Sequence, residues 1–199
     1  MSDFITGREV KLGIKKAATW RTAVSVGADD GFYILNEGIG AKEPEFRDDD
    51  SLGQDDIRCT YQVAESVQGA NLNGYLRYNH WDLLFALALG SVGTPTLLES
   101  TAYYNSYSPA SGIDGYFATL AMKKANTTYG IWEVPSAKFH GFQVEGEIGE
   151  LARVTFNFAG NKIETVSPTN DSTSIGNLTF PTGCNVAKMD ARFKIRMNA

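Results

Sequence analysis

The highest local density of ionisable side chains in this sequence is a run of acidic residues in its first third. Residues 43–56 hold seven carboxylates and one arginine, a net charge of −6, while the whole chain of 199 residues carries −5. Carboxylates at this density could bind calcium, but the EF-hand spacing fails, because Leu52 and Cys59 fall where that loop needs oxygen ligands. An irregular calcium site, a solvated loop and a charged contact surface for a partner are the interpretations left open.

Catalytic sites are hard to build from this composition. His80 and His140 are the two histidines. Ser136 lies close to His140, but no Gly-x-Ser-x-Gly turn accompanies it, and a nucleophile needs a positioned base. Paired carboxylates could serve a glycosidase, yet a solvated face is the simpler interpretation of Glu145, Glu147 and Glu150. We expect no enzyme activity, no metal and no cofactor, and a hydrolase using His140 is the least favoured function.

The charge balance and the cysteines exclude other classes. The net negative charge disfavours a free-standing nucleic-acid binder. No segment approaches the roughly 18 apolar residues that span a bilayer, and the N-terminus lacks a basic region followed by an apolar stretch, so we expect no membrane span and no secretory signal. Cys59 and Cys184 are predicted to be two buried thiols in a reducing compartment.

The secondary-structure elements that would position these residues are mostly β-strands. Apolar and polar residues alternate with period two at Val154–Phe158, at Ile57–Val63 and at Phe193–Met197, which predicts strands with one buried face. Weaker strand patterns lie at 9–15, 32–35, 74–78, 130–134 and 138–146. Parallel sheets give unbroken apolar runs instead, so the fold class is predicted to be mainly β, an antiparallel β-sandwich or barrel.

One helix is predicted at His80–Leu89. Asn79 is a suitable N-cap, Asp82 three residues later resembles a capping box, and Gly90 stands where a helix ends. The structural stripe of this helix is predicted to pack on a sheet and comprises Trp81, Leu84, Phe85 and Ala88. Residues 91–115 and 167–183 are expected as long loops. No repeat or shift in composition divides the chain, so residues 1–199 are expected to form one domain.

Several segments follow one another in a characteristic order along most of the chain. They are Gly7–Lys16 with Thr19–Val24, the acidic loop, Arg58–Tyr61, Gly74–Tyr78 leading into the helix, Ala137–Phe142 and Arg192–Asn198. In this order they resemble the tail tube (major tail) proteins of long-tailed bacteriophages. Similar proteins commonly continue past the position of Asn198 and Ala199, so this is either a short member or a sequence that stops before the natural C-terminus.

The resemblance implies an architecture and an assembly. A β-sandwich or barrel with a flanking helix forms homohexameric rings, which stack into a hollow tube for DNA delivery. Strands of all subunits join into one inner barrel, which removes exposed sheet edges. The implied location is the virion tail, after synthesis in the host cytoplasm, with other tail proteins as partners. An acidic lumen would repel phosphates, so DNA would pass without specific binding. Contractile injection and secretion machines share this fold.

The acidic loop gains a role in such an assembly. Ordering a loop costs about 1–2 kcal/mol per residue, which favours a loop that becomes ordered against a neighbouring subunit. Exposed ion pairs contribute roughly 0–1 kcal/mol each, so apolar anchors are expected to matter more than the acids. A basic stripe near the C-terminus either faces solvent or contacts the acidic surface of a neighbouring subunit. The predicted contact residues are Phe46, Arg47, Asp48, Asp49, Asp50, Leu52, Asp55, Asp56, Arg192, Lys194 and Arg196.

A different class of function remains as the alternative. A monomeric β-barrel or sandwich could bind a small ligand or a sugar. Tyr103, Tyr104 and Tyr107 would supply its aromatic stacking patch.

Overall fold

The computed structural model describes residues 10–42, 45–47, 60–62, 65–78, 81–91, 94–100, 102–112, 114–124, 130–182, 186–187 and 189, and at 45–47 and 60–62 the backbone alone. Two helices and a short 3-10 turn, η2 (Ala28–Asp30), accompany the strands of this part of the chain. The helices are α1 (Asp82–Leu89) and α2 (Ser172–Gly176). The strands are β1 (Lys11–Ala17), β2 (Gly31–Phe32), β3 (Asn36–Glu37), β4 (Ala41–Lys42), β5 (Glu45–Arg47), β6 (Thr60–Gln62), β7 (Ser66–Tyr75), β8 (Thr96–Glu99), β9 (Ala102–Tyr104), β10 (Phe117–Lys123), β11 (Ile131–Glu145) and β12 (Arg153–Gly160).

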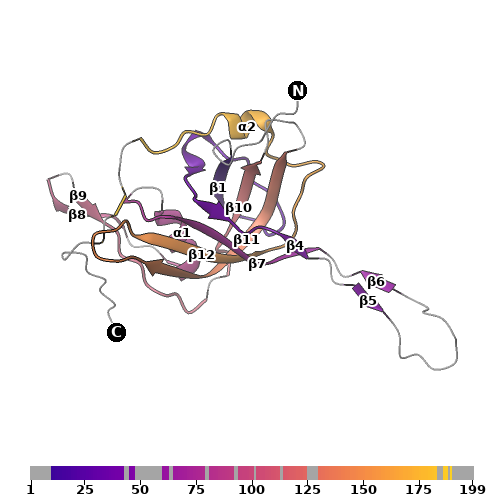
Figure 1. Ribbon diagram of the computed structural model, residues 1–199, viewed down its shortest axis with the longest axis horizontal. Helices are drawn as coiled ribbons and strands as arrows, with labels where there is room; N and C mark the ends of the chain where they lie inside the picture. The colour runs from indigo at the N-terminus through magenta and orange to yellow at the C-terminus, as the bar shows by residue number, and fades with distance from the viewer. Residues whose placement is uncertain are drawn as a thin grey trace.

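One antiparallel sheet dominates the molecule (Figure 1). Its strands follow the order β2-β1-β10-β11-β12-β7-β3, and β4 also pairs with β7. Two short hairpins, β5–β6 and β8–β9, form separate two-stranded sheets. The antiparallel, mainly β fold class predicted from the sequence is therefore confirmed.

Strand β11 is the corner of the sheet. Its first half pairs with β10 from Ile131 to Ala137, and its second half pairs with β12 from Ala137 to Glu145. A register shift interrupts the second ladder between Phe139 and Gly141, and such irregularities bend a strand. Consequently β1 and β10 run steeply in Figure 1 while β7 and β12 lie nearly horizontal. The sequence suggested two separate strands here, at 130–134 and 138–146, whereas the structure has one continuous strand.

The two ends of the sheet are close together along the chain. Strands β2 and β3 stand at opposite ends of the strand order, yet only residues 33–35 separate them in sequence. A connection of that length spans at most about 14 Å. The amide of Leu35 donates to the carbonyl of Asn73 at 2.8 Å, which holds this connection against β7. The sheet therefore curls around its core as a partly open barrel.

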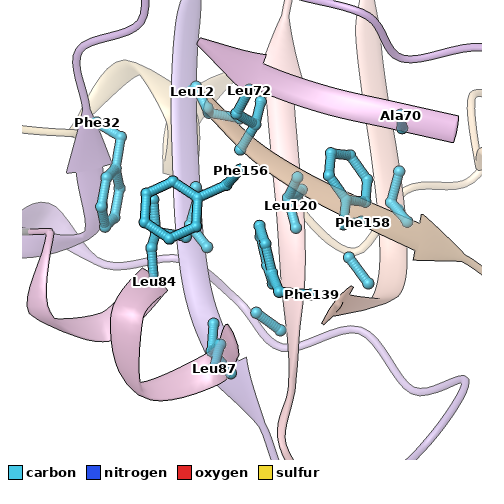
Figure 2. Packing of buried hydrophobic residues seen from close by; sticks show 14 of the residues in the cluster. Leu12, Phe32, Ala70, Leu72, Leu84, Leu87, Leu120, Phe139, Phe156 and Phe158 are labelled. Carbon is cyan, nitrogen blue, oxygen red and sulfur yellow. The ribbon is translucent and has the colours of Figure 1, made fainter. Parts of the chain in front are cut away.

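The core lies inside this curl. Period-two residues of β12 fill it, since Val154, Phe156 and Phe158 are all fully buried, as their alternation predicted. Phe139 of β11 meets Phe158 with ring centroids 5.4 Å apart. Figure 2 shows these rings between the strands and the side chains of α1. The large residues labelled there are Leu12, Phe32, Leu72, Leu84, Leu87, Leu120, Phe139, Phe156 and Phe158.

Helix α1 packs against the sheet as predicted, but it begins two residues later than expected. Trp81 occupies the N-cap position without a side-chain cap, and Asp82 is the first helical residue. Trp81 thus holds the N-cap position that was expected for Asn79, and Asn79 itself lies outside the described residues. The carboxylate of Asp82 instead accepts a hydrogen bond from the hydroxyl of Tyr107. The predicted end is confirmed, because Gly90 adopts φ 81° and its amide donates to the carbonyl of Ala86.

All members of the predicted helix stripe face the core. Trp81 and Leu84 are buried, and Phe85 and Ala88 are partly buried against the same cluster. Leu87 is fully buried as well. The stripe thus covers more than one narrow face of the helix, which is what a helix enclosed by a curled sheet requires.

A second apolar layer covers the outer face of the β1–β10–β11 half. Val26, Ile175 of α2 and Leu178 pack there against Ala121 and Ile131. Strand β10 is therefore buried on both faces, and only Lys123 at its end is partly exposed. A strand covered on both faces shows no period-two alternation, which is why the sequence did not reveal β10.

A buried carboxylate on the sheet is hydrogen-bonded to this outer layer. Glu133 of β11 is 1% exposed. Its oxygens accept hydrogen bonds from the backbone amides of Thr169 at 3.1 Å and Asn170 at 2.8 Å, and from the side-chain amide of Asn170 at 2.6 Å. The side-chain oxygen of Asn170 in turn accepts from the amide of Val26 at 2.7 Å. A buried polar group is tolerated when its bonds are made in this way.

The stretches expected as long loops hold short elements. Strands β8 and β9 form a hairpin within residues 91–115, and α2 lies within 167–183. Part of the acidic segment is also regular, since residues 45–47 form β5 and pair with β6. Ser, Thr, Tyr and Asn dominate these stretches, and they fit short exposed hairpins as well as loops.

Candidate assembly surfaces

The residues considered for catalysis do not form a site. His140 is exposed on β11, whereas Ser136 is fully buried and its hydroxyl accepts a hydrogen bond from the amide of Arg21 at 2.8 Å. The carboxylates of Glu145, Glu147 and Glu150 lie on exposed residues at the end of β11 and in the turn that follows it. His80 lies outside the described residues. Among the residues that the structure describes, this arrangement does not bring a nucleophile and a base together.

The described ranges offer neither a metal-binding cluster nor a helical membrane span. Within them, histidine, cysteine, aspartate and glutamate nowhere gather in groups of three or more that could hold a metal ion. In the same part of the chain no helix has both the length and the hydropathy to cross a bilayer. Cys59 and Cys184 lie outside it.

A two-stranded arm leaves the main sheet at one end of β7. Lys42 of β4 pairs with Ser66 at the start of β7, and Glu45 of β5 then pairs with Gln62 of β6. The β5–β6 ladder thus continues the β4–β7 ladder outward. Figure 1 shows β5 and β6 standing well away from the rest of the molecule. We call residues 43–64 the arm; they include the acidic segment 43–56, of which the structure describes the backbone of 45–47 alone.

Most of the predicted contact residues lie beyond what the structure describes. Phe46 and Arg47 belong to β5, where the backbone path alone is defined. The predicted residues outside the described ranges are Asp48, Asp49, Asp50, Leu52, Asp55, Asp56, Arg192, Lys194 and Arg196.

The outer side of the β11–β12–β7 half carries a polar surface. Asn71 pairs in register with Asn157, and Asn73 pairs with Thr155, which pairs with Gln143. The side-chain amide of Asn73 donates to the hydroxyl of Thr155 at 2.8 Å. We call these five residues the polar sheet face. They are half-buried or exposed, while the residues that alternate with them fill the core.

None of the five side chains in the polar sheet face is charged. Opposite charges meet at its border, where Glu145 stands in register with Arg153. Sequence reasoning gave β12 one apolar and one polar face, but it did not identify the polar face as a functional surface. The available signal was the series of amides and hydroxyls between the apolar residues of β7 and β12, which indicates an open face that is polar without being charged.

The three tyrosines proposed as a stacking patch are not equivalent. Tyr107 packs its ring on Phe85 at 5.7 Å between centroids. Burial, and then its hydrogen bond to Asp82, raise the pKa of Tyr107 above the usual tyrosine range. Tyr103 and Tyr107 line one pocket, whereas Tyr104 does not. Tyr107 therefore anchors the chain to α1, and the three rings do not present a single platform.

That pocket has a volume of about 270 Å³ and lies between α1, the end of β7 and strand β9 with the residues after it. Among the residues that line it are Arg77, Tyr78, Trp81, Tyr103 and Asn105. Tyr78 and Tyr103 are 72% and 66% exposed. We call it the Arg77 pocket. Its rim is aromatic and open to solvent, unlike the core beneath it.

Comparison with known proteins assigns the chain to a family. A family model described as "Phage tail tube protein" matches residues 7–193. Among solved structures the fold is similar to the anti-feeding prophage cap, a tube terminating cap, with TM-score 0.46 and 8% identity over 82% of this chain and 91% of that one. It is also similar to the PVC sheath-tube complex of an extracellular contractile injection system, with TM-score 0.45 and 10% identity over 82% and 92%. A type six secretion system protein gives TM-score 0.39 and 11% identity over 75% and 78%. No curated protein matches the sequence.

Proposed function

Because the chain belongs to the phage tail tube protein family, we propose that it assembles into stacked hexameric rings whose central channel conducts DNA. The family makes it a structural component of a tail tube, and the ring, the channel and the DNA are the proposal. In this role it needs no catalytic group and no cofactor. Its partners are copies of itself and other tail proteins.

The observation that carries the proposal is the uncharged polar sheet face. Binding of DNA by proteins rests chiefly on lysines and arginines that neutralise phosphates. A surface of amides and hydroxyls such as Asn71, Asn73 and Thr155 stays hydrated and offers phosphates no cation. We propose that this face lines the channel. DNA then slides because the channel wall is neutral. This differs from the acidic wall that the overall charge of the chain suggested.

The arm supplies the contact between subunits in this proposal. A two-stranded ribbon that projects from one end of a domain buries little surface within its own subunit. Phe46 and Leu52 are the apolar residues that would anchor it on a neighbour. A sheet edge that continues into a neighbouring subunit also removes unpaired backbone groups from solvent.

Imaging the purified full-length protein tests the assembly. Light scattering gives the particle mass, and negative-stain microscopy gives its shape. We expect rings or tubes with a central hole. A species with the mass of one chain at every concentration and salt condition would overturn the proposal and favour a monomeric binding protein.

Lysine substitutions test the channel wall. The double variant Asn71→Lys with Asn157→Lys should form tubes that bind duplex DNA and protect it from nuclease. High salt should abolish this protection, and native tubes should give no protection. Val166→Lys is the control, because Val166 is 88% exposed on the segment after β12. Equal protection by both variants would show that the polar sheet face does not line the channel.

A further inference from the structure

The side chain of Arg77 lacks the partner that its environment calls for. Its guanidinium carbon lies 4.8 Å from the ring centroid of Tyr33, and its Nε atom is buried without a hydrogen-bond partner. Within the described residues every ion pair involves a lysine, and none involves Arg77. A buried hydrogen-bond donor without a partner lowers the stability of the fold. The Arg77 side chain can therefore gain a hydrogen bond from an acceptor on another molecule.

The surroundings of Arg77 define the ligand. The side-chain oxygen of Asn105 is also buried without a partner, and it lines the same pocket. Asp82 is the acid among the residues that line this pocket, and it is engaged by the hydroxyl of Tyr107. A carboxylate with an adjacent backbone amide would satisfy both orphan atoms, since the carboxylate accepts from Arg77 and the amide donates to Asn105. The exposed rings of Tyr78 and Tyr103 offer apolar contact beside them.

The sequence contains one dense source of such groups. The acidic segment of the arm carries net −6 and places Leu52 directly after the acids 48–50 and Ser51. The described strands of the arm leave from the start of β7, whereas Arg77 lies just past the end of that strand. The ten residues of β7 span about 30 Å, and β5 and β6 extend farther in the opposite direction (Figure 1).

We propose that the acidic run of the arm, Asp48 to Asp50, docks in the Arg77 pocket of a neighbouring copy. This inference rests on the proposed assembly and names the two surfaces that meet. Because the arm and the pocket are different surfaces at opposite ends of β7, the contact is head-to-tail. Such a contact closes into a ring or propagates along a filament. It also assigns the acids a partner other than Arg192, Lys194 and Arg196.

The partly buried position of Arg77 changes the expected strength of the contact. Pairs on an open surface contribute little, whereas removing one member of a desolvated charge pair across an interface is costly. The acids of the arm should therefore matter as well as its apolar residues.

Charge reversal with rescue tests the contact in the full-length protein. Sedimentation velocity would compare the native chain, Arg77→Glu, a triple variant with Asp48, Asp49 and Asp50 changed to Lys, and the combination of both. Each reversal alone should weaken self-association at least tenfold, and the combination should restore most of it. Arg21→Glu is the matched control and should associate like the native chain, because Arg21 is exposed and belongs neither to the Arg77 pocket nor to the polar sheet face.

A second variant controls for the case in which Arg77→Glu fails to fold. Asn105→Asp preserves the shape of the side chain and places a carboxylate in the same pocket, so it should compete with the arm and weaken association without removing Arg77. Native association by Arg77→Glu or by Asn105→Asp, or a combination that restores nothing, would overturn the inference. Native particles that are not tubes, together with rescue, would support the docking and overturn the tube. A native chain that never associates overturns both.

Discussion

The indole ring of Trp81 fills the space in front of Gly74. A Cβ atom placed on Gly74 would lie 2.7 Å from Cη2 of Trp81 and 3.3 Å from the carbonyl oxygen of Tyr33. Trp81 stands immediately before α1, and Gly74 lies in β7. The ring also stacks on Phe156 at 5.7 Å between centroids. This contact joins the start of the helix to the sheet, and it requires a residue without a side chain in β7.

Replacing Gly74 by alanine should therefore destabilise the subunit. The added methyl group meets a large buried ring and a backbone oxygen, and neither can move freely. We expect a loss of about 1–3 kcal/mol, the range for overpacked cores, measured by urea denaturation. Gly141→Ala is the control, because a Cβ atom there meets nothing within 4 Å. An equal effect of both substitutions would contradict the proposed contact.

Truncation of the helix should cost stability through lost burial. Leu84 is 1% exposed and lies in the main core, so Leu84→Ala should cost about 2–5 kcal/mol. Phe85→Ala should cost less because Phe85 is partly buried. Thermal unfolding measures both, and Ile148→Ala, at a residue 87% exposed, should leave the melting temperature unchanged. Unchanged melting of the Leu84 variant would refute the packing of α1.

Glu133→Gln tests the buried carboxylate. An amide has one acceptor oxygen where the carboxylate has two, and its NH₂ group would face either the donor of Thr169 or the two donors of Asn170. At least one donor is left unpaired, which costs about 1–3 kcal/mol. Chemical denaturation at pH 7 measures the loss. The side-chain oxygen of Glu65 accepts from the amide of Ile163 at 2.9 Å, so Glu65→Gln, which keeps an acceptor, is the milder comparison. A larger loss for Glu65 than for Glu133 would go against this account.

The stability of α2 should depend on pH through Asp171. Hydrogen bonds to its carboxylate, first from the amide of Ser174, lower the pKa of Asp171 below its ordinary value of 3.8. A lowered pKa in the folded state favours the ionised form, so the contribution to stability is present above pH 3.8 and is lost as the pH falls through the lowered pKa.

The melting temperatures of the native chain and Asp171→Ala should accordingly differ at pH 7 and converge in strong acid. Asp114→Ala is a comparison without a helix cap, since Asp114 is fully exposed and pairs weakly with Lys138 at 3.4 Å. Its difference from the native chain should stay small at both pH values. A constant difference for Asp171→Ala across the range would show that the cap does not depend on ionisation.

Shortening the arm should separate folding from assembly. Deleting residues 47–54 removes the acidic run and Leu52 but leaves the main sheet intact. We expect a folded subunit with a native melting temperature that no longer forms long tubes in negative-stain images. Ser51→Ala, a change within the same segment, should assemble normally. Native tubes from the shortened variant would show that the arm is not the contact between rings.

The sequence alone was sufficient for elements that bury one face. The alternation of Val154, Phe156 and Phe158 identified β12, and the stripe ending at Gly90 identified α1, because burial of one side imposes a period on the chain itself. The order of such elements also sufficed for the resemblance to tail tube proteins. Boundaries were less certain, as the start of α1 at Asp82 shows.

Tertiary structure decided everything that depends on two-sided burial or on distant partners. Strand β10 has no period because a second layer covers it, and the carboxylate of Glu133 is buried because segments more than thirty residues away bond to it. The Arg77 pocket brings Arg77 together with Asn105 and with Ala187 near the C-terminus. No local pattern reports such a meeting, because each residue is ordinary in its own stretch of sequence. Their unpaired atoms become meaningful only where the fold brings them together.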